Sequence, residues 1–106
     1  MGASIDELAE KAERASANYA RVNGIARDAD WYLMKVQEEA GELLAEHLRA
    51  TGRSRTGGKS AAEIRTDLEN EAADLLGQLL CYCRHHDIDL EAALERKWFV
   101  HLEPAK

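Results

Sequence analysis

The chain has 106 residues, and 20 Asp and Glu against 14 Lys and Arg give it a formal net charge of −6 at pH 7. Binding to nucleic acid over a broad surface depends on clustered cations that displace counterions from phosphate, so this composition argues against it. No stretch has the apolar length of a membrane span, and the start of the chain lacks the regions of a signal peptide. We therefore expect a cytoplasmic protein that binds neither nucleic acid nor a membrane.

The length predicts one domain, residues 1–106, with room for only a modest core. The chain is rich in Ala, Leu and Glu, contains one Pro, and is 32% charged. These properties favour helices and leave little material for a sheet. The expected fold class is all-α, a four-helix bundle whose core is completed by oligomerisation into a dimer or tetramer.

The first helix is predicted from capping chemistry. Ser4 followed by Glu7 suits a capping box, in which each residue satisfies a backbone N–H of the other. The helix is expected to run to about Arg21, before the break at Asn23-Gly24.

The second helix starts at one of two neighbouring acids. Asp28 or Asp30 can cap it, and it is expected to end near Ala50. The segment 51–59 contains three glycines and several basic residues, which predicts a flexible basic loop.

Capping residues also predict the starts of the third and fourth helices. Ser60 with Glu63 forms another capping box, and the third helix is expected to reach about Arg84. Residues 85–88 turn the chain, and Asp89 caps a short last helix.

Two short acidic motifs lie on the second and third of these helices, Glu-Glu-Ala-Gly-Glu at 38–42 and Glu-Ala-Ala-Asp at 71–74. Residues three or four apart share a helix face, so Glu39 and Glu42 project together, as do the two acids of the second motif. Like charges gathered without a partner repel one another, and a divalent cation removes that cost.

Each helix also places an apolar sector beside its acidic flank. The apolar positions are Leu33, Val36, Ala40, Leu43, Leu44 and Leu48 in one helix and Ile64, Leu68, Ala72, Leu75, Leu76, Leu79 and Cys83 in the other. The flanks hold Glu39, Glu42 and Glu46 in one and Asp67, Glu71, Asp74 and Gln78 in the other. Antiparallel packing would bring the flanks to a common edge, where carboxylate oxygens suit Mg²⁺ or Mn²⁺ rather than zinc.

Solvated helix faces are the simpler interpretation of these acids. An exposed face usually interleaves Lys four residues away, whereas Glu42, Glu71 and Asp74 have no basic residue three or four positions away in either direction. From the residue pattern alone, both interpretations remain open.

Glu-Glu-x-x-Glu followed by Glu-x-x-Asp on the next long helix resembles the signature of the MazG-like all-α nucleoside triphosphate pyrophosphatases. The resemblance runs from about Trp31 to Trp98, and residues 87–94 with Lys97 look like the closing helix of that family. The chain departs from the pattern at His101, where many members carry Asn, and in its last five residues.

This resemblance implies that Glu39, Glu42, Glu71 and Asp74 are metal ligands. Glu38 would be an additional ligand or a group just outside the ligands, so Glu38 and Glu39 are the expected catalytic residues. The cofactor would be Mg²⁺, with Mn²⁺ able to replace it.

The chemistry expected is metal-assisted attack of water on a phosphoanhydride, with Glu38 positioning or deprotonating the water. The resemblance implies cleavage between the α and β phosphates of a nucleoside triphosphate, which yields a nucleoside monophosphate and pyrophosphate, as in nucleotide-pool housecleaning. Lys97 is a candidate phosphate contact, and Trp31 and Tyr82 are candidates to stack on the base, with Tyr82 preferred. The loop residues of 49–59 either meet the outer phosphates or only solubilise the surface.

Three other kinds of protein share features with this sequence. Zinc would use Cys81, Cys83 and His85, but one helix carries all of them, and structural zinc sites add a second pair elsewhere. A di-iron bundle needs Glu three residues before His, which none of the four His has. The remaining alternative is a noncatalytic helical interaction module with solvated acidic faces.

Overall fold

The computed structural model describes residues 2–104, which form four α-helices and no strand, as the all-α prediction requires. The helices are α1 (Ile5–Asn23), α2 (Ala29–Ala50), α3 (Ala61–His85) and α4 (Leu90–Lys97), followed by the 3₁₀ turn η1 (Phe99–His101).

The predicted helix starts are confirmed. Ser4 and Ser60 each form a complete capping box, Asp28 accepts a hydrogen bond from the Trp31 N–H, and Asp89 caps α4. The helix α1 ends two residues later than expected, because the left-handed conformation that closes it falls on Gly24, with φ 65°. The turn η1 was not predicted.

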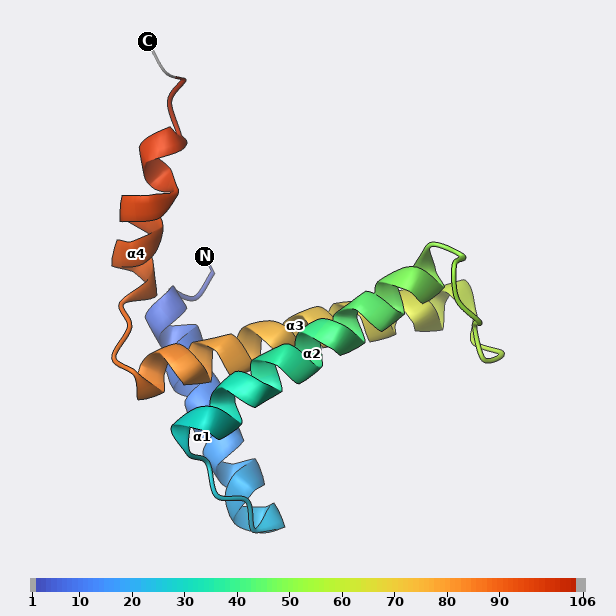
Figure 1. Ribbon diagram of the computed structural model, residues 1–106, viewed down its shortest axis with the longest axis horizontal. Helices are drawn as coiled ribbons and strands as arrows, with labels where there is room; N and C mark the ends of the chain where they lie inside the picture. Colours follow the sequence, from blue (N-terminus) through green and yellow to red (C-terminus); the bar gives the residue numbers. More distant parts are fainter. Residues whose placement is uncertain (1, 105–106) are drawn as a thin grey trace.

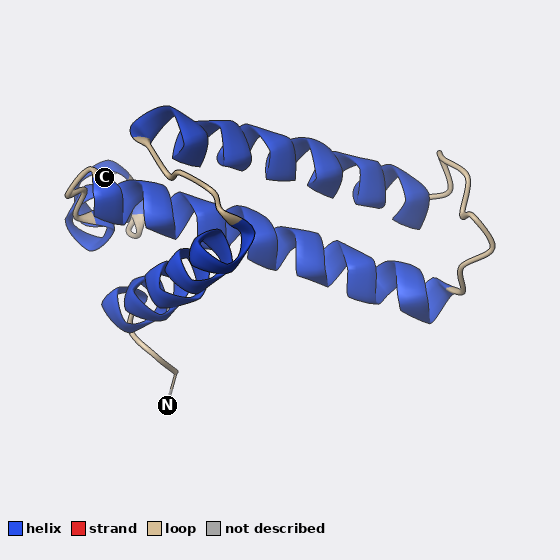
Figure 2. Cartoon of the chain, turned by 90° about the horizontal axis from the view of Figure 1, so that it is seen from below, coloured by secondary structure: helices blue, strands red, loops and turns tan. Residues whose placement is uncertain are grey.

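The helices α2 and α3 lie side by side and antiparallel, joined by the loop of residues 51–60 (Figures 1 and 2). The helix α1 crosses α3 near the end of the hairpin remote from this loop, and α4 leaves that end at a steep angle to the hairpin (Figure 1). The described residues thus form a helical hairpin with one crossing helix and a projecting arm.

A polar contact network fixes the end of the hairpin where α1 crosses. Arg27, just before α2, binds Glu13 of α1 at 2.8 Å and donates to the Ser16 hydroxyl at 3.1 Å. The buried Tyr32 ring lies against His85 of α3, with 4.9 Å between ring centroids. These contacts join α1, α2 and α3.

The buried apolar core is small. It consists of Ala20, Tyr32, Ile64, Leu80, Cys81 and Cys83. Of the positions predicted to form apolar sectors, Leu33, Leu44 and Leu76 remain 50%, 57% and 48% exposed. Leu80 is only 3% exposed, because α1 packs over that part of α3, so this leucine needs no cover from another chain.

The shape is open for a chain of this length. The radius of gyration is 16.6 Å, whereas a compact domain of this length has about 13 Å. The accessible surface is 8064 Å², against about 5,900 Å² for a compact monomer of this mass. A closed four-helix core is therefore not formed by residues 2–104 of one chain.

In the described part of the chain, no helix combines the length and the apolar character that crossing a membrane requires.

Loss of the α3 cap should lower stability by a predictable amount. In Ser60→Ala, the Glu63 N–H loses the hydroxyl that accepts from it at 3.1 Å, so we expect the free energy of unfolding to fall by about 1 kcal/mol in urea titrations. Ser54→Ala, in the exposed loop, is the matched control and should change little. Equal stabilities of the two variants would contradict the capping role.

Candidate metal centre

Three of the predicted ligands converge where α2 packs on α3. Glu39 and Glu42 of α2 and Glu71 of α3 each offer a carboxylate oxygen, and these atoms lie within 4.8 Å of one another. They form the acidic triad. Glu39 and Glu42 share a face because they are three residues apart, and antiparallel packing sets Glu71 opposite them.

The triad is set into the helix interface rather than along its edge. Glu39 is only 8% exposed, Glu71 is partly buried and Glu42 is exposed. The sequence placed Glu39 on a flank, but the close approach of α2 to α3 covers it. One side of the acidic triad is therefore buried, and the other side is exposed to solvent.

Two oxygens of the triad are buried without a hydrogen-bond partner among the described residues, Glu39 Oε2 and Glu71 Oε2. One turn further along α2, Glu46 Oε2 is also unpaired, although the other Glu46 oxygen accepts from Arg49 at 2.7 Å. Buried polar atoms are normally paired, and an unpaired buried carboxylate is costly. These oxygens call for a proton or a cation.

The pKa values of Glu71 and Glu39 also indicate that these carboxyls need a proton or a cation. Burial raises the pKa of Glu71 from 4.5 to about 7, assisted by its contact with the Glu39 carboxyl and by the charges of Glu42 and Asp74. Burial also raises the pKa of Glu39, and the charges of Asp74 and Glu42 add to this, while interaction with Glu71 opposes it. One proton held between Glu39 and Glu71 relieves the repulsion.

The residues fit a hard divalent cation. All three donors are carboxylate oxygens, which suit Mg²⁺ or Mn²⁺, and two of them present orphaned buried atoms that a cation would satisfy. Among the described residues, this group meets the geometric requirement for a metal site, whereas Cys81, Cys83 and His85 do not converge in that way.

Asp74 and Glu38 lie outside the triad. Asp74 is exposed one turn after Glu71, and it borders the same cavity as Glu39. Glu38 is exposed and forms an ion pair with Lys35 Nζ at 3.1 Å. The helix rotation that separates neighbouring residues therefore sends Glu38 away from Glu39, as the wheel predicts.

A cavity of about 520 Å³ opens beside the triad, between α1, α2 and α3. Its walls include Glu39 and Asp74 at one end, and Trp31 and Tyr19 among its aromatic residues. This volume falls within the range of small-molecule sites. The aromatic candidate Trp31 thus lines the same cavity as Glu39 and Asp74.

The other predicted substrate contacts are not brought to this cavity. Tyr82 lies on α3 with its ring against His86, 4.5 Å between centroids, and is not part of the cavity wall. Lys97 is the last residue of α4, which projects away from the hairpin (Figure 1). Among the basic residues of segment 49–59, Arg49 at the end of α2 binds Glu46 and the Arg55 carbonyl, and Lys59 pairs with Asp67.

Two residues that line the cavity are not among those predicted from the sequence. Lys35 and Tyr19 line the cavity. The spacing of Trp31, Lys35 and Glu39 at i, i+4 and i+8 would have put Lys35 on this face. Tyr19 carries no such signal, because only the crossing of α1 over α3 brings it there.

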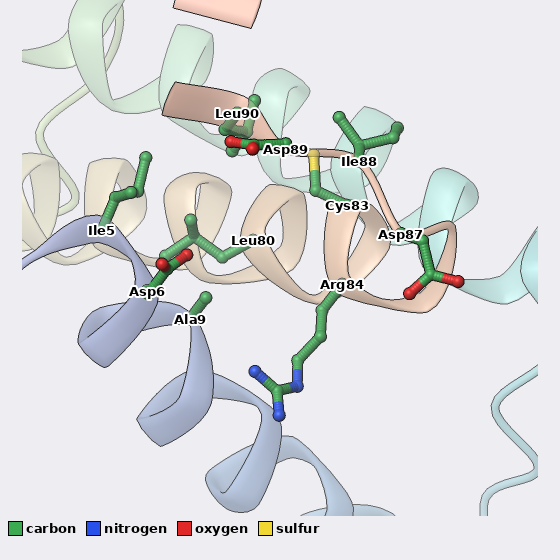
Figure 3. A pocket seen from close by; sticks show the side chains of 10 residues that line it. All are labelled: Ile5, Asp6, Ala9, Leu80, Cys83, Arg84, Asp87, Ile88, Asp89 and Leu90. Atoms are coloured by element: carbon green, nitrogen blue, oxygen red, sulfur yellow. The ribbon is translucent and has the colours of Figure 1, made fainter. Parts of the chain in front are cut away.

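A second cavity, of about 510 Å³, lies where α1, α3 and the start of α4 meet (Figure 3). Its wall includes Ile5, Leu80 and Cys83, and Figure 3 shows the Cys83 thiol directed to the side of Ile88 while Arg84 extends the opposite way. None of the triad residues lines it. Burial raises the pKa of the Cys83 thiol, so this cysteine behaves as a small apolar side chain.

A scan against models of known protein families finds no match to this chain, and searches of curated proteins and of solved structures find none either. The acidic motifs and the geometry of the triad therefore carry the functional argument.

The free energy of unfolding of the metal-free protein should fall as pH rises. A carboxyl whose pKa is raised on folding binds a proton that the unfolded chain has released, so stability declines through the window between the two pKa values. For Glu71 that window is 4.5 to about 7, and we expect the melting temperature in EDTA to drop from about pH 5 to about pH 8. Glu71→Gln should flatten the decline.

The control for this experiment is Glu69→Gln, which alters an exposed carboxylate paired with Arg65. It should keep the pH dependence of the unmodified protein, and Mg²⁺ should restore stability at the alkaline end. Identical melting curves for Glu71→Gln and the unmodified protein across this range would overturn the buried-carboxyl account.

Proposed function

We propose that this protein is a Mg²⁺-dependent nucleoside triphosphate pyrophosphatase that releases pyrophosphate and a nucleoside monophosphate. The observation that carries the proposal is the convergence of Glu39, Glu42 and Glu71, with two buried oxygens unpaired. Of the three, Glu39 also borders a ligand-sized cavity. The motif resemblance supplies the reaction, including cleavage between the α and β phosphates. Two free cysteines suit the reducing cytoplasm, where nucleotide pools are maintained.

The acidic triad would hold the cation, and Asp74 would complete the oxygen set from the cavity side. A bound Mg²⁺ supplies charge neutralisation for the polyphosphate and lowers the pKa of a coordinated water. The burial of Glu39 and the partial burial of Glu71 between α2 and α3 restrict the movement of these side chains. Glu42 is the exposed member of the triad and is therefore open to solvent.

Glu38 takes an outer role in this proposal, acting on the attacking water without holding the cation. Its link to the site is Lys35, whose ammonium binds Glu38 and whose side chain borders the cavity. The Lys35 ammonium is also suited to contact a phosphate.

A noncatalytic interaction module is the second candidate, favoured by the amount of exposed apolar side chain. Trp98, Val100 and Leu102 are 69%, 64% and 74% exposed on the projecting arm. An interaction module gives no reason for two orphaned carboxylate oxygens at one point, so the hydrolase accounts for more of the structure.

Release of pyrophosphate from a panel of ordinary and modified nucleoside triphosphates, with Mg²⁺ and with EDTA, tests the activity. Glu39→Gln should lower kcat/KM about 100-fold or more at limiting Mg²⁺ and be partly rescued by excess Mn²⁺. Glu38→Gln should bind metal nearly normally yet turn over about tenfold more slowly at any metal concentration.

Glu69→Gln serves again as the control and should keep full activity, since its carboxylate lies on α3 outside the triad. Calorimetric titration with Mg²⁺ separates binding from turnover. Equal losses of metal affinity in the Glu38 and Glu39 variants would refute the division of roles, and absence of pyrophosphate release from every substrate would refute the activity.

We further infer that the chain self-associates and that a complete bundle forms between copies. The accessible surface exceeds that of a compact monomer by about 2,100 Å², an excess in the range that stable protein interfaces bury. Exposed leucines on both α2 and α3 support an interface that includes these helices, in a proposed dimer or tetramer.

Light scattering at micromolar concentration should report at least a dimer. Leu44→Glu puts a charge on an exposed apolar site of α2 and should shift the protein toward monomer with a lower melting temperature. Lys11→Glu, an exposed change on α1, should leave assembly unchanged. A monomer whose melting is independent of concentration would rule out this inference.

A further inference from the structure

The arm formed by α4 and η1 carries apolar side chains that its own chain leaves uncovered. The helix α4 contacts η1 but makes little contact with α1, α2 or α3, and Figure 1 shows it projecting from the end of the hairpin. Trp98, Val100 and Leu102, near the end of the arm, are all mostly exposed. Large apolar side chains gathered on one projecting element indicate an interaction surface.

The arm starts beside the second cavity, the one of about 510 Å³, and the wall of that cavity is partly apolar. Ile5 of α1, Ile88 and Leu90 line it (Figure 3). Ile88 is 43% exposed, so part of this apolar wall is open to solvent. The volume is sufficient for bulky side chains. An apolar hollow therefore lies where the arm begins, and bulky apolar side chains lie where it ends.

The two ends of the arm also differ in charge. We call residues 87–91 the base of the arm and residues 96–102 its tip. The base and the adjoining cavity hold the acids Asp6, Asp87, Asp89 and Glu91, against the cation Arg84. The tip holds the cations Arg96 and Lys97 and no acid, although Glu95 and Glu103 flank it. Within residues 2–104, none of these charged groups forms an ion pair.

Two copies of the arm complement each other when they pack antiparallel. A two-fold axis then sets the tip of each arm beside the base of the other, so every contact occurs twice. Arg96 and Lys97 of one copy approach the acids at the base of the other copy. Parallel arms would instead set acid against acid and leave both apolar tips away from the hollow, so the charges favour the antiparallel arrangement.

The surface of the chain leaves room for this interface in addition to one formed by α2 and α3. The chain exposes 8064 Å², an excess of about 2,100 Å² over a compact monomer. One standard interface takes about 800 Å² from each partner, so two of them need about 1,600 Å² per chain. The excess accommodates both.

We propose that the arm is an assembly element that docks on a second copy of this chain, with its apolar tip at the cavity between α1, α3 and the base of the other arm. The contact is reciprocal, and it does not depend on the hydrolase activity. Together with the association through α2 and α3 proposed above, arm pairing joins two dimers into a tetramer. Without that association, arm pairing alone gives a dimer.

Charge reversal at each end of the arm tests the pairing, with the mass of the assembly measured by light scattering and native mass spectrometry. The tip variant combines Arg96→Glu with Lys97→Glu, and the base variant combines Asp6→Lys with Glu91→Lys. Each variant alone sets like charges against each other in both contacts, so each should have half the mass of the unmodified assembly. An equimolar mixture of the two sets opposite charges together in both contacts and should regain the full mass.

The matched control combines Arg53→Glu with Arg55→Glu, which makes the same change in net charge in the exposed loop that joins α2 to α3. It should keep the mass of the unmodified assembly, because this loop lies at the end of the hairpin remote from the arm (Figure 1). Circular dichroism checks the fold of each variant.

Trp98 reports the contact directly. The chain has two tryptophans, so in Trp31→Phe the emission comes from Trp98 alone. Trp98 is 69% exposed in the single chain, so we expect its emission to shift to shorter wavelength and its quenching by acrylamide to fall as dilute protein is concentrated and associates. When the tip variant is made in the same background, Trp98 should stay exposed at every concentration.

Several results would overturn arm pairing while leaving the association through α2 and α3 in place. These are an unchanged mass of the tip or base variant, and a mixture that fails to regain the mass. If Trp98 is shielded at every concentration without a change of mass, the arm covers its own chain, and if it stays exposed in the assembly, the arm serves a different partner. Either result overturns the inference, and an unmodified protein that stays monomeric overturns both interfaces. Pyrophosphate release tests the proposed activity separately.

Discussion

The packing of α2 against α3 buries two carboxylates of like charge at one point, and the rest of the site follows from that constraint. Glu39 and Glu71 cannot both be ionised and unpartnered in this interface without a large cost, which is why burial raises the pKa of each. Either a proton or a cation must compensate. The same contact that supplies most of the helix packing is therefore where we expect pH and divalent metal to act on stability.

In the proposed function, this arrangement would lower the stability of the metal-free protein, and the metal ligands would be held by rigid helices. Helix-borne carboxylates keep their spacing because the backbones of α2 and α3 are fixed by packing against each other. The cross-helix contacts of Arg27 with Glu13, and of Tyr32 with His85, brace the far end of the hairpin. The acidic end of the cavity, at Glu39, and its aromatic end, at Trp31, are thus held at a constant distance from each other.

The open shape of the chain connects the site to assembly. The described residues bury few large apolar side chains, and the arm of α4 and η1 makes little contact with the hairpin. In the proposed oligomer, cover for α2 and α3 would stabilise the same helices that carry the triad. Metal affinity and association would then reinforce each other, because each favours the packed hairpin.

The sequence by itself determined the helices, their caps and the pairing of the acidic motifs. Ser60 and Glu63 cap α3 through local hydrogen bonds, and Glu39 and Glu42 share a face through helix geometry, so both could be read from spacing. Only the tertiary structure decided which acids are buried, that Gln78 borders a cavity, and that α1 supplies Tyr19 to its wall. These features depend on how closely helices approach and at what angle they cross, and residue periodicity along one helix carries no information about either.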